Sequence, residues 1–333
     1  MAPGLNGQGD AQPRRRRRAV SGVLVLDKPS GMTSNAALQR VKWLFRAEKA
    51  GHTGALDPLA TGVLPLCFGE ATKFSQYLLD ADKTYRAEAR LGVVTDSGDA
   101  DGAVLSEHPV PALSRDELEA VLARFRGGIE QVPSMFSALK QGGRPLYELA
   151  RQGVTVERAA RSIRVDSLEL ESLAGDRFAF VARVSKGTYI RSLVEDIGQA
   201  LGCGAHVTAL RRLAAGRLGI AQAVTLAEVE QVAEAAGEAG LDALLLPPDT
   251  ALDGWPVVTL SPESAYHARR GQAVPAGDVP AGTLVAVYED AGAGPRVFVG
   301  IGEITGDGRL APRRLVNTGN GVPGNAGSGV ASP

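Results

Sequence analysis

A twelve-residue stretch at positions 51–62 (GHTGALDPLATG) combines ionisable side chains with three glycines, which let a backbone approach a ligand closely. Its aspartate, Asp57, precedes Pro58, and a following proline favours an extended backbone from which the carboxylate projects. Asp-Pro is also a common helix start, with the aspartate as N-cap, and for an isolated pair this is the more frequent case. Asp57 is therefore a candidate for catalysis on a bound ligand, with a helix cap as the alternative.

Arg191 is the second candidate for a functional residue, because its position in a helix is unfavourable for a positive charge. It follows residues 185–190 (SKGTYI) and lies in the first turn of the clearest amphipathic helix, where the helix dipole disfavours a cation. Broken local rules often mark functional positions. The alternative is an arginine whose stem packs while its head stays in solvent.

Several elements must position these two residues. Hydrophobic periodicity and turn signals predict buried strands, amphipathic helices and one long hairpin. The predicted strands are 22–27, 62–68, 83–91 and 206–213, the hairpin pairs 154–173 with 177–184, and the predicted helices are 34–45, 70–79, 114–125, 190–201, 226–235 and 241–246.

Two further segments carry polar side chains without clear periodicity. Residues 95–102 (TDSGDADG) superficially suggest a calcium loop, but the EF-hand spacing fails, and we expect an acidic surface turn. Residues 126–152 are dense in Lys, Arg and aromatic side chains, which is typical of a mobile lid that orders on a ligand.

The C-terminal third predicts a separate module. After Pro247-Pro248, short apolar strands at 255–260, 283–288, 297–304 and 310–316 are separated by Gly and Pro, which indicates a small β-barrel. We expect disordered tails at 1–19, which contains the run Arg14–Arg18, and at 318–333.

Composition narrows the class of protein. A length of 333 residues with 44% apolar content suits about two domains, and no apolar run is long enough to span a membrane. Two cysteines, without metal-ligand spacing, fit a reducing cytoplasm and exclude a disulfide framework. The net charge is −1, but residues 140–220 carry 13 basic against 8 acidic side chains, whereas residues 221–307 carry 3 against 13. A polyanion would therefore bind the middle of the chain.

The motifs taken together resemble those of the TruB family, synthases that make pseudouridine in the T-arm of transfer RNA. The resemblance covers most of the chain, in the family's order. The matching segments are 22–34, 51–62, 83–85, 185–191 and 202–212, and 302–316 resembles the C-terminal PUA-like RNA-binding module of bacterial members. One departure is residues 132–136 (VPSMF), where the family more often has a second proline and a tyrosine.

The resemblance implies an α+β fold: a mixed, largely antiparallel sheet of pseudouridine-synthase type with flanking helices at 20–249, including the lid, and a PUA-like β-barrel at 250–317. It implies isomerisation of uridine at position 55 in the T-loop, after the base is flipped out of its stack. No atom is lost in that reaction, so no cofactor and no metal are expected. The expected partner is transfer RNA, without an obligatory protein partner, for a cytoplasmic monomer.

The resemblance also assigns roles to residues. Asp57 matches the nucleophile, Arg191 would favour its charged form, and Tyr189 is the candidate to move the C5 proton. Tyr85 matches the residue that stacks on the flipped base. The remaining substrate-binding candidates are His52, Lys73, Leu210, Arg211 and Arg212.

Three alternatives remain at this level. A non-catalytic RNA-binding or RNA-folding protein would keep the basic surface without requiring Asp57. A glycosidase would need a second carboxylate facing Asp57, and no second acidic motif is evident. A guide-dependent relative would share the catalytic core, although the bacterial-type C-terminal module favours a stand-alone enzyme. Attack at C1′ of the ribose and attack at C6 of the base both stay open.

Overall fold

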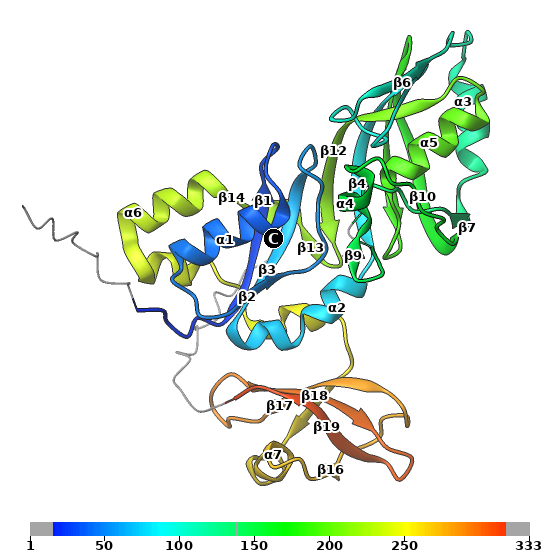
Figure 1. Ribbon diagram of the computed structural model, residues 1–333. Coiled ribbons are helices and arrows are strands. Elements are labelled where there is room, and N and C mark those ends of the chain that lie inside the picture. The colour runs from blue at the N-terminus through cyan, green and yellow to red at the C-terminus, as the bar shows by residue number, and fades with distance from the viewer. Residues whose placement is uncertain (1–15, 138, 318–333) are drawn as a thin grey trace, which may run out of the picture.

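A computed structural model describes residues 16–137 and 139–317 of the protein. The larger part of the chain forms a long sheet with helices at both ends, and the C-terminal residues form a smaller sheet below it (Figure 1). Two short ribbons, β5–β6 and β8–β9, stand apart from both sheets. The expected α+β architecture is confirmed, as is the division of the strands between a large sheet and a small one.

The large sheet has ten strands in the order β14-β1-β3-β12-β4-β11-β10-β7, with β13 paired to β12 and β2 paired to β3. Most pairs are antiparallel, and β1–β14 and β12–β3 are parallel. The expectation of a mixed, largely antiparallel sheet is therefore confirmed. Its strands are β1 (Gly22–Lys28), β2 (Ala50–His52), β3 (Thr61–Phe68), β4 (Lys83–Leu91), β7 (Gly127–Gln131), β10 (Arg161–Ala174), β11 (Arg177–Val184), β12 (Ala205–Ala215), β13 (Leu218–Gly219) and β14 (Val224–Thr225).

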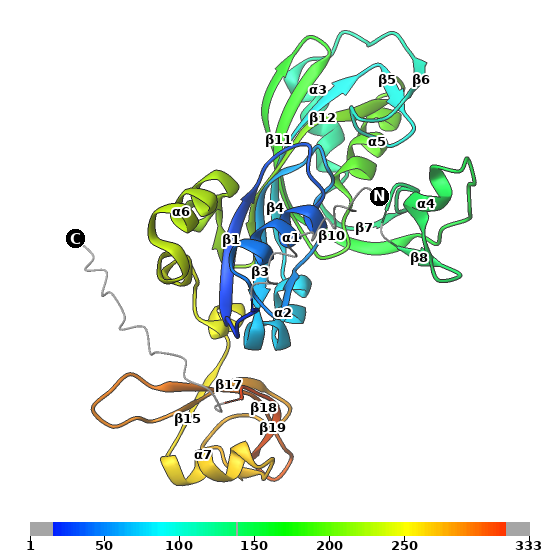
Figure 2. The same ribbon diagram turned by 60° about the vertical axis from the view of Figure 1, so that its left-hand side comes forward.

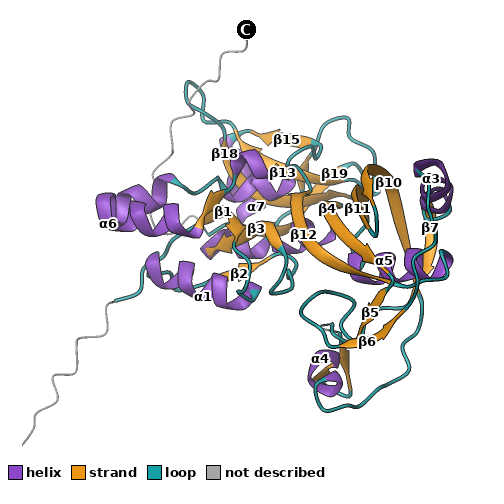
Figure 3. Cartoon of the chain, turned by 90° about the horizontal axis from the view of Figure 1, so that it is seen from above, coloured by secondary structure: helices purple, strands orange, loops and turns teal. Residues whose placement is uncertain are grey.

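Helices cover the two ends of this sheet. Seen from above, α1 and α6 lie at one end, and α3 and α5 lie at the other (Figure 3). Their apolar faces and one face of the sheet form the main core. The helices are α1 (Ser34–Leu44), α2 (Ser75–Asp80), α3 (Arg115–Ala123), α4 (Leu146–Ala150), α5 (Ile190–Ala200) and α6 (Leu226–Ala243), with 3-10 turns η1 (Gly69–Lys73), η2 (Ile220–Gln222) and η3 (Pro248–Leu252).

Four predicted elements differ in extent from the observed ones. The helix expected at 70–79 is a 3-10 turn followed by α2, and the first hairpin strand begins at Arg161 instead of residue 154. The two helices expected at 226–246 are joined as α6, although Gly237 has a non-helical φ of 59° and marks the expected break. Short-range periodicity located these elements, but it carries no information on the sheet pairing that decides where a strand begins.

The predicted lid is only partly a loop. Residues 127–131 are β7, which pairs with β10 at the edge of the large sheet. The rest contains the small ribbon β8 (Lys140–Gln141) and β9 (Arg144–Pro145) followed by α4, and this part projects away from the sheet (Figure 2). Residue 138 lies outside the described residues.

The C-terminal module is a curled five-stranded sheet in the order β15-β17-β18-β19-β16. The four predicted strands are present, whereas α7 was not predicted, although Ser261 caps it and Pro262 begins it. The elements are β15 (Val257–Leu260), α7 (Pro262–Arg269), β16 (Val274–Pro275), β17 (Leu284–Glu289), β18 (Val297–Ile304) and β19 (Arg309–Leu315).

The expected N-terminal tail ends earlier than residue 19. Arg18 forms an isolated bridge with Ala47, and its guanidinium pairs with Asp242 of α6 at 2.7 Å, so this end of the basic run packs on the protein. Residues 1–15 and the expected tail at 318–333 lie outside the described residues. Within 16–137 and 139–317, no helix has the length and apolar character needed to cross a membrane.

Candidate active site

Asp57 lies on the irregular connection between β2 and β3, and no helix begins at Asp57-Pro58, so the helix-cap alternative is wrong. The connection is anchored at several points. The Ser34 hydroxyl accepts a hydrogen bond from the Leu56 amide at 2.7 Å and donates to the Leu56 carbonyl at 3.0 Å, and the Gly31 amide donates to the Pro58 carbonyl at 2.8 Å. The first residues of α1 therefore hold the loop, and the Asp57 side chain remains 38% exposed.

Arg191 reaches Asp57 from the first turn of α5. Its Nε lies 2.9 Å from Asp57 Oδ2, and its Nη2 donates to Asp57 Oδ1 at 3.2 Å, which is the two-bond geometry that suits a guanidinium and a carboxylate. The side chain is only 4% exposed, so the alternative of a solvent-exposed head is wrong. The remaining donors bind the carbonyls of Ser97 at 2.7 Å and Phe136 at 2.8 Å.

Asp99 is a second carboxylate at this arginine, and the expectation of a surface turn at 95–102 is wrong for it. Its side chain is 7% exposed and its Oδ2 lies 3.7 Å from Arg191 Nε. The hairpin β5 (Val93–Thr95) and β6 (Val104–Glu107) turns these residues inward. The Ser97 hydroxyl donates to Asp99 Oδ1 at 2.6 Å.

The only sequence signal for the inward turn around Asp99 was the small size of the neighbouring residues, and the structure shows what that size permits. Small residues surround the aspartate, and Gly98 and Gly102 both lie where a Cβ would collide with a neighbouring side chain. A surface turn would not require that closeness.

Lys28 was also missed as a candidate near the loop. It is fully buried, and its ammonium donates to the carbonyls of Pro29 at 2.8 Å and Met32 at 2.6 Å. Burial lowers the Lys28 pKa to about 8, opposed by the attraction of Asp57. The sequence contains no signal for this burial, because Lys28 follows Asp27 at the end of an apolar run, where exposure is expected.

The charges around Asp57 oppose one another. Burial raises the pKa of the Asp57 carboxyl, Arg191 lowers it through charge and hydrogen bonding, and the negative charge of Asp99 raises it again. The arginine thus offsets the cost of holding an ionised carboxylate in a partly dry site. The net effect is an Asp57 pKa above its usual value, and because the side chain is still 38% exposed, the ionised carboxylate can reach a ligand as a candidate nucleophile.

Tyr85 and Leu210 are brought together beside the loop. They lie on the adjacent strands β4 and β12, are 9% and 8% exposed, and belong to one buried cluster with Leu56 of the loop. An aromatic ring and an aliphatic side chain at the edge of a core suit the two faces of a planar base.

Tyr189 lies at the N-cap position of α5, immediately before the helix that carries Arg191. Its backbone exchanges two hydrogen bonds with the Gln131 side chain on β7, at 2.8 and 3.1 Å. Burial raises the pKa of its hydroxyl, which therefore stays protonated at neutral pH.

His52 ends β2, where it pairs with Leu66. Burial, with a smaller effect of the nearby Arg212 charge, lowers the His52 pKa, so the ring is neutral at pH 7. Its Nδ1 is buried and has no hydrogen-bond partner among the described residues. The ring is therefore a structural neighbour of the loop, and its buried Nδ1 is not accessible to a ligand in this conformation.

Arg212 and Lys73 lie elsewhere than expected. Arg212 is 1% exposed and is not displayed, because its guanidinium points inward and binds the carbonyls of Val63 at 2.6 Å and Gly54 at 3.0 Å. Lys73 follows the far end of β3 from the Asp57 loop and donates to the carbonyl of Leu315, so it contacts the C-terminal module. Sequence spacing could not show the burial of Arg212 or the contact of Lys73. Which face of β12 is covered and where the module lies are features of the tertiary structure.

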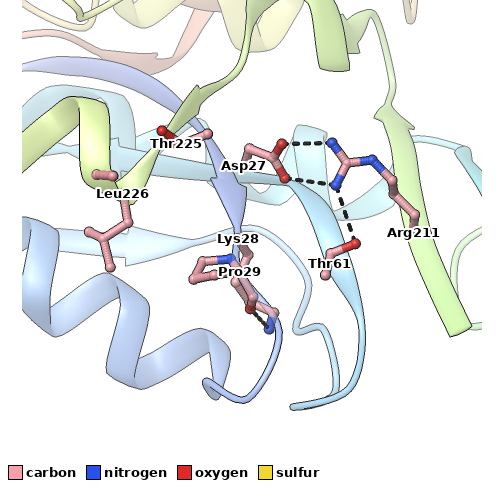
Figure 4. A pocket seen from close by; sticks show the side chains of 8 residues that line it. Asp27, Lys28, Pro29, Thr61, Arg211, Thr225 and Leu226 are labelled. Atoms are coloured by element: carbon pink, nitrogen blue, oxygen red, sulfur yellow. Dashed lines mark hydrogen bonds and ion pairs between the residues drawn. The ribbon is translucent and has the colours of Figure 1, made fainter.

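Arg211 of β12 lines a pocket of about 410 Å³ formed with the end of β1, the first residue of β3 and the start of α6 (Figure 4). It forms two bonds with Asp27, at 2.6 and 3.1 Å, and a third with the Thr61 hydroxyl at 3.2 Å. It therefore steadies the strand that leaves the Asp57 loop, and its side chain is 39% exposed. No three His, Cys, Asp or Glu side chains among the described residues are grouped as metal ligands.

Comparisons with known proteins cover the chain almost continuously. Residues 42–190 match the TruB family pseudouridylate synthase N-terminal domain, residues 191–253 the tRNA pseudouridylate synthase B C-terminal domain, and residues 256–316 the pseudouridine synthase II TruB C-terminal domain.

Curated relatives are similar over nearly their full length. The tRNA pseudouridine synthase B of Stutzerimonas stutzeri is 57% identical over 92% of this chain and 99% of its own. The protein of that name from Pseudomonas aeruginosa strain UCBPP-PA14 is 56% identical over 92% of this chain and 100% of its own.

Solved structures share the fold. A Cbf5-Nop10-Gar1 complex matches with a TM-score of 0.66 and 29% identity, over 85% of this chain and 78% of that one. An H/ACA RNP bound to a substrate RNA containing 2′-deoxyuridine matches with a TM-score of 0.67 and 26% identity, over 88% and 84% of the two chains. With three domain models spanning both sheets and relatives above 50% identity, this chain belongs to the TruB family of pseudouridylate synthases.

Proposed function

We propose that this protein converts uridine 55 in the T-loop of transfer RNA to pseudouridine, with Asp57 as the nucleophile. The observation that carries the proposal is the two-bond pair between Asp57 and the buried Arg191, on a loop that Ser34 anchors. The relatives named tRNA pseudouridine synthase B support the choice of RNA.

The reaction is balanced within one nucleotide. The bond from ribose C1′ to N1 of uracil breaks, a bond from C1′ to C5 forms, the proton on C5 is lost, and N1 gains one. No redox change occurs and no atom is lost, so no cofactor is required. The base is flipped out of the T-loop stack before a side chain reaches it.

The residues divide this work as follows. Asp57 attacks C1′ of the ribose or C6 of the base, while Arg191 keeps it ionised. Tyr85 and Leu210 hold the two faces of the flipped uracil, and Tyr189 moves the C5 proton. His52, at the edge of the site, braces the opened loop of the RNA.

Arg211 and Arg212 then act mainly by holding the loop, through Thr61 and through Gly54 and Val63 respectively. The protein works as a monomer in the cytoplasm, without an obligatory protein partner. We expect the lid residues after β7, 132–137 and 139–152, to close over the bound RNA.

The test is Asp57→Asn, which keeps the shape of the side chain and removes its charge. We expect no pseudouridine, measured by position in an unmodified T-arm hairpin, and a change in RNA affinity of at most a few fold. Turnover by this variant would refute Asp57 as the nucleophile. If the wild-type protein promotes RNA folding but forms no pseudouridine, the RNA-folding alternative is favoured.

A guide-dependent synthase is the second candidate, because the solved H/ACA structure shares the fold. The same assay distinguishes it. Conversion of the bare hairpin by purified protein, with no added guide RNA, would exclude dependence on a guide. Conversion only with a guide would overturn the stand-alone proposal.

A further inference from the structure

The C-terminal module is joined to the large domain by a polar contact that the catalytic site does not use. On η1, the Lys73 ammonium donates to the Leu315 carbonyl at 2.9 Å and to Glu70 Oε2 at 2.7 Å. Glu70 Oε2 also accepts from the Asn317 amide at 2.6 Å. We call Glu70 and Lys73, with the backbone of Leu315 and Asn317, the η1 clasp.

The two side chains of the η1 clasp are partly buried and carry opposite charges. The Lys73 and Glu70 side chains are 27% and 25% exposed. Burial alone would raise the pKa of the Glu70 carboxyl, but the bonds from Lys73 and Asn317 lower it, so the carboxylate is ionised at neutral pH. Next to Lys73, the ring of Phe74 packs against Phe298 of β18 with centroids 5.2 Å apart. The η1 clasp therefore lies beside an apolar contact between the two parts of the chain.

The strand that the clasp holds differs in charge from the rest of its module. Residues 250–307 carry 7 acidic and 3 basic side chains, whereas β19 contains Arg309, Arg313 and Arg314 and no acidic residue. Arg313 and Arg314 are exposed and directly precede Leu315, and the Arg313 guanidinium forms an ion pair with Glu303 of β18 at 2.7 Å, which a phosphate would replace. A row of exposed arginines on an otherwise acidic module is suited to phosphate groups.

We propose that Lys73 is a positioning residue that holds β19 so that Arg313 and Arg314 bind phosphates of the same transfer RNA outside the T-arm. The proposal rests on the function proposed above. A rigid link lets two binding surfaces engage one RNA without the entropic cost of ordering a free module. Lys73 would then affect binding of the complete RNA and leave the chemistry at Asp57 unchanged.

The experiment compares Lys73→Met with Lys42→Met, which removes the same charge from α1, away from the η1 clasp. KM, kcat and RNA affinity are measured on complete unmodified transfer RNA and on the T-arm hairpin. We expect Lys73→Met to raise KM and Kd for the complete RNA by about 3- to 10-fold, a usual size for coupling between interacting residues. Its kcat, and all values for the hairpin, should match those of Lys42→Met.

The double-mutant background decides whether Lys73 acts through β19. In a protein that already carries Arg313→Gln and Arg314→Gln, we expect Lys73→Met to have no further effect on the complete RNA. If Lys73→Met weakens binding of the complete RNA in this background as much as in the wild type, the proposal is overturned. It is also overturned if Lys73→Met weakens binding of the hairpin as much as binding of the complete RNA. Glu70→Gln keeps an oxygen for the Asn317 amide and should give a smaller shift in the same direction, even if Lys73→Met folds poorly.

The two proposals fail in different ways. If the wild type converts neither RNA, the proposed function is wrong, and the affinity measurements still test the η1 clasp. If the wild type converts both RNAs and Lys73→Met changes neither affinity, the clasp has no positioning role and the proposed function stands.

Discussion

Arg191 occupies a first helical turn, where the dipole of α5 disfavours its charge, and four groups compensate. The carboxylates of Asp57 and Asp99 and the carbonyls of Ser97 and Phe136 all face its guanidinium. Two of these groups come from the turn at 95–102 and one from the lid. The arginine thus connects the nucleophile candidate to two segments that are distant in sequence.

The two candidate tyrosines, Tyr85 and Tyr189, should respond differently to loss of the hydroxyl. Tyr85→Phe keeps the ring that stacks on uracil, and because a base–aromatic stack contributes roughly 1–3 kcal/mol, this variant should stay active whereas Tyr85→Leu should not. Tyr189→Phe should leave RNA binding intact and slow product formation by roughly 10²–10⁴-fold, the usual scale for a positioned acid–base group. Single-turnover assays on one T-arm hairpin compare them. Equal, mild losses for both phenylalanine variants would exclude Tyr189 as the proton carrier.

Glu195, one turn after Arg191, makes stability depend on pH. Its carboxylate packs against Gly98 of the Asp99 turn, and burial raises its pKa to about 7, opposed by the positive charge of Arg191. The folded state then binds more protons than the unfolded state between the ordinary pKa of 4.5 and about 7. Stability therefore falls as pH rises through this window, and the loss is complete above it.

Glu195→Gln removes that titration while keeping the size of the side chain. Since one pKa unit corresponds to about 1.4 kcal/mol, the variant should be more stable than the wild type at pH 8 by at most about 3 kcal/mol. At pH 4.5 the difference should nearly vanish. Urea unfolding of both proteins at the two pH values measures it, and an equal difference at both would show that ionisation of Glu195 is not the cause.

At the scale of elements, the Asp57 loop depends on a close approach between β3 and β12. Gly62 has a φ of +101°, and a Cβ there would stand 2.2 Å from the Arg212 carbonyl oxygen. Only two residue pairs join these parallel strands, Arg211 with Thr61 and Arg212 with Gly62. The glycine is thus required both by its backbone conformation and by the lack of space beside it.

Gly62→Ala should lower the free energy of unfolding by more than the roughly 1–3 kcal/mol expected for backbone strain alone. It should also reduce turnover, because the strand that leaves the loop must shift. Gly175→Ala is the control, since Gly175 has a φ of +61° in the β10–β11 turn and open space beside it. Similar losses for both variants, in urea unfolding, would mean that the contact with Arg212 contributes little.

At the scale of the whole molecule, the C-terminal module shares a hydrophobic core with the large sheet. One buried cluster includes Val63 and Phe74 from the large domain together with Tyr288 and Ile301 from the module. Across the same junction the ring of Tyr77 packs on Trp255 with centroids 4.7 Å apart. The expected boundary near residue 250 separates two sheets that each have a core of their own, and this third, shared cluster joins them.

Truncation after Thr250 should therefore destabilise the catalytic part as well as weaken RNA binding. It exposes Phe74 and Tyr77, and each large apolar side chain returned to water costs about 2 kcal/mol. We expect a lower melting temperature and loss of turnover on both complete transfer RNA and the T-arm hairpin. An unchanged melting temperature, with only complete transfer RNA affected, would show that the module is an independent unit.

The sequence by itself determined the elements and the family. The α5 face, β4 from Lys83 to Leu91, and the four main strands of the module follow from periodicities that depend on neighbouring residues only. The Asp57 loop was recognisable because the glycines, the proline and the carboxylate that define it lie within twelve residues of one another.

The tertiary structure decided which side chains meet. Asp99 and Lys28 were missed, and Arg212 and Lys73 were misplaced, because a charged residue near a strand end predicts exposure until the segments that cover it are known. Asp99 is buried by a hairpin that folds inward, Arg212 by carbonyls of the loop across a parallel strand pair, and Lys73 by the last strand of the module. Those contacts join residues from 92 to 242 positions apart, a range that no local pattern encodes.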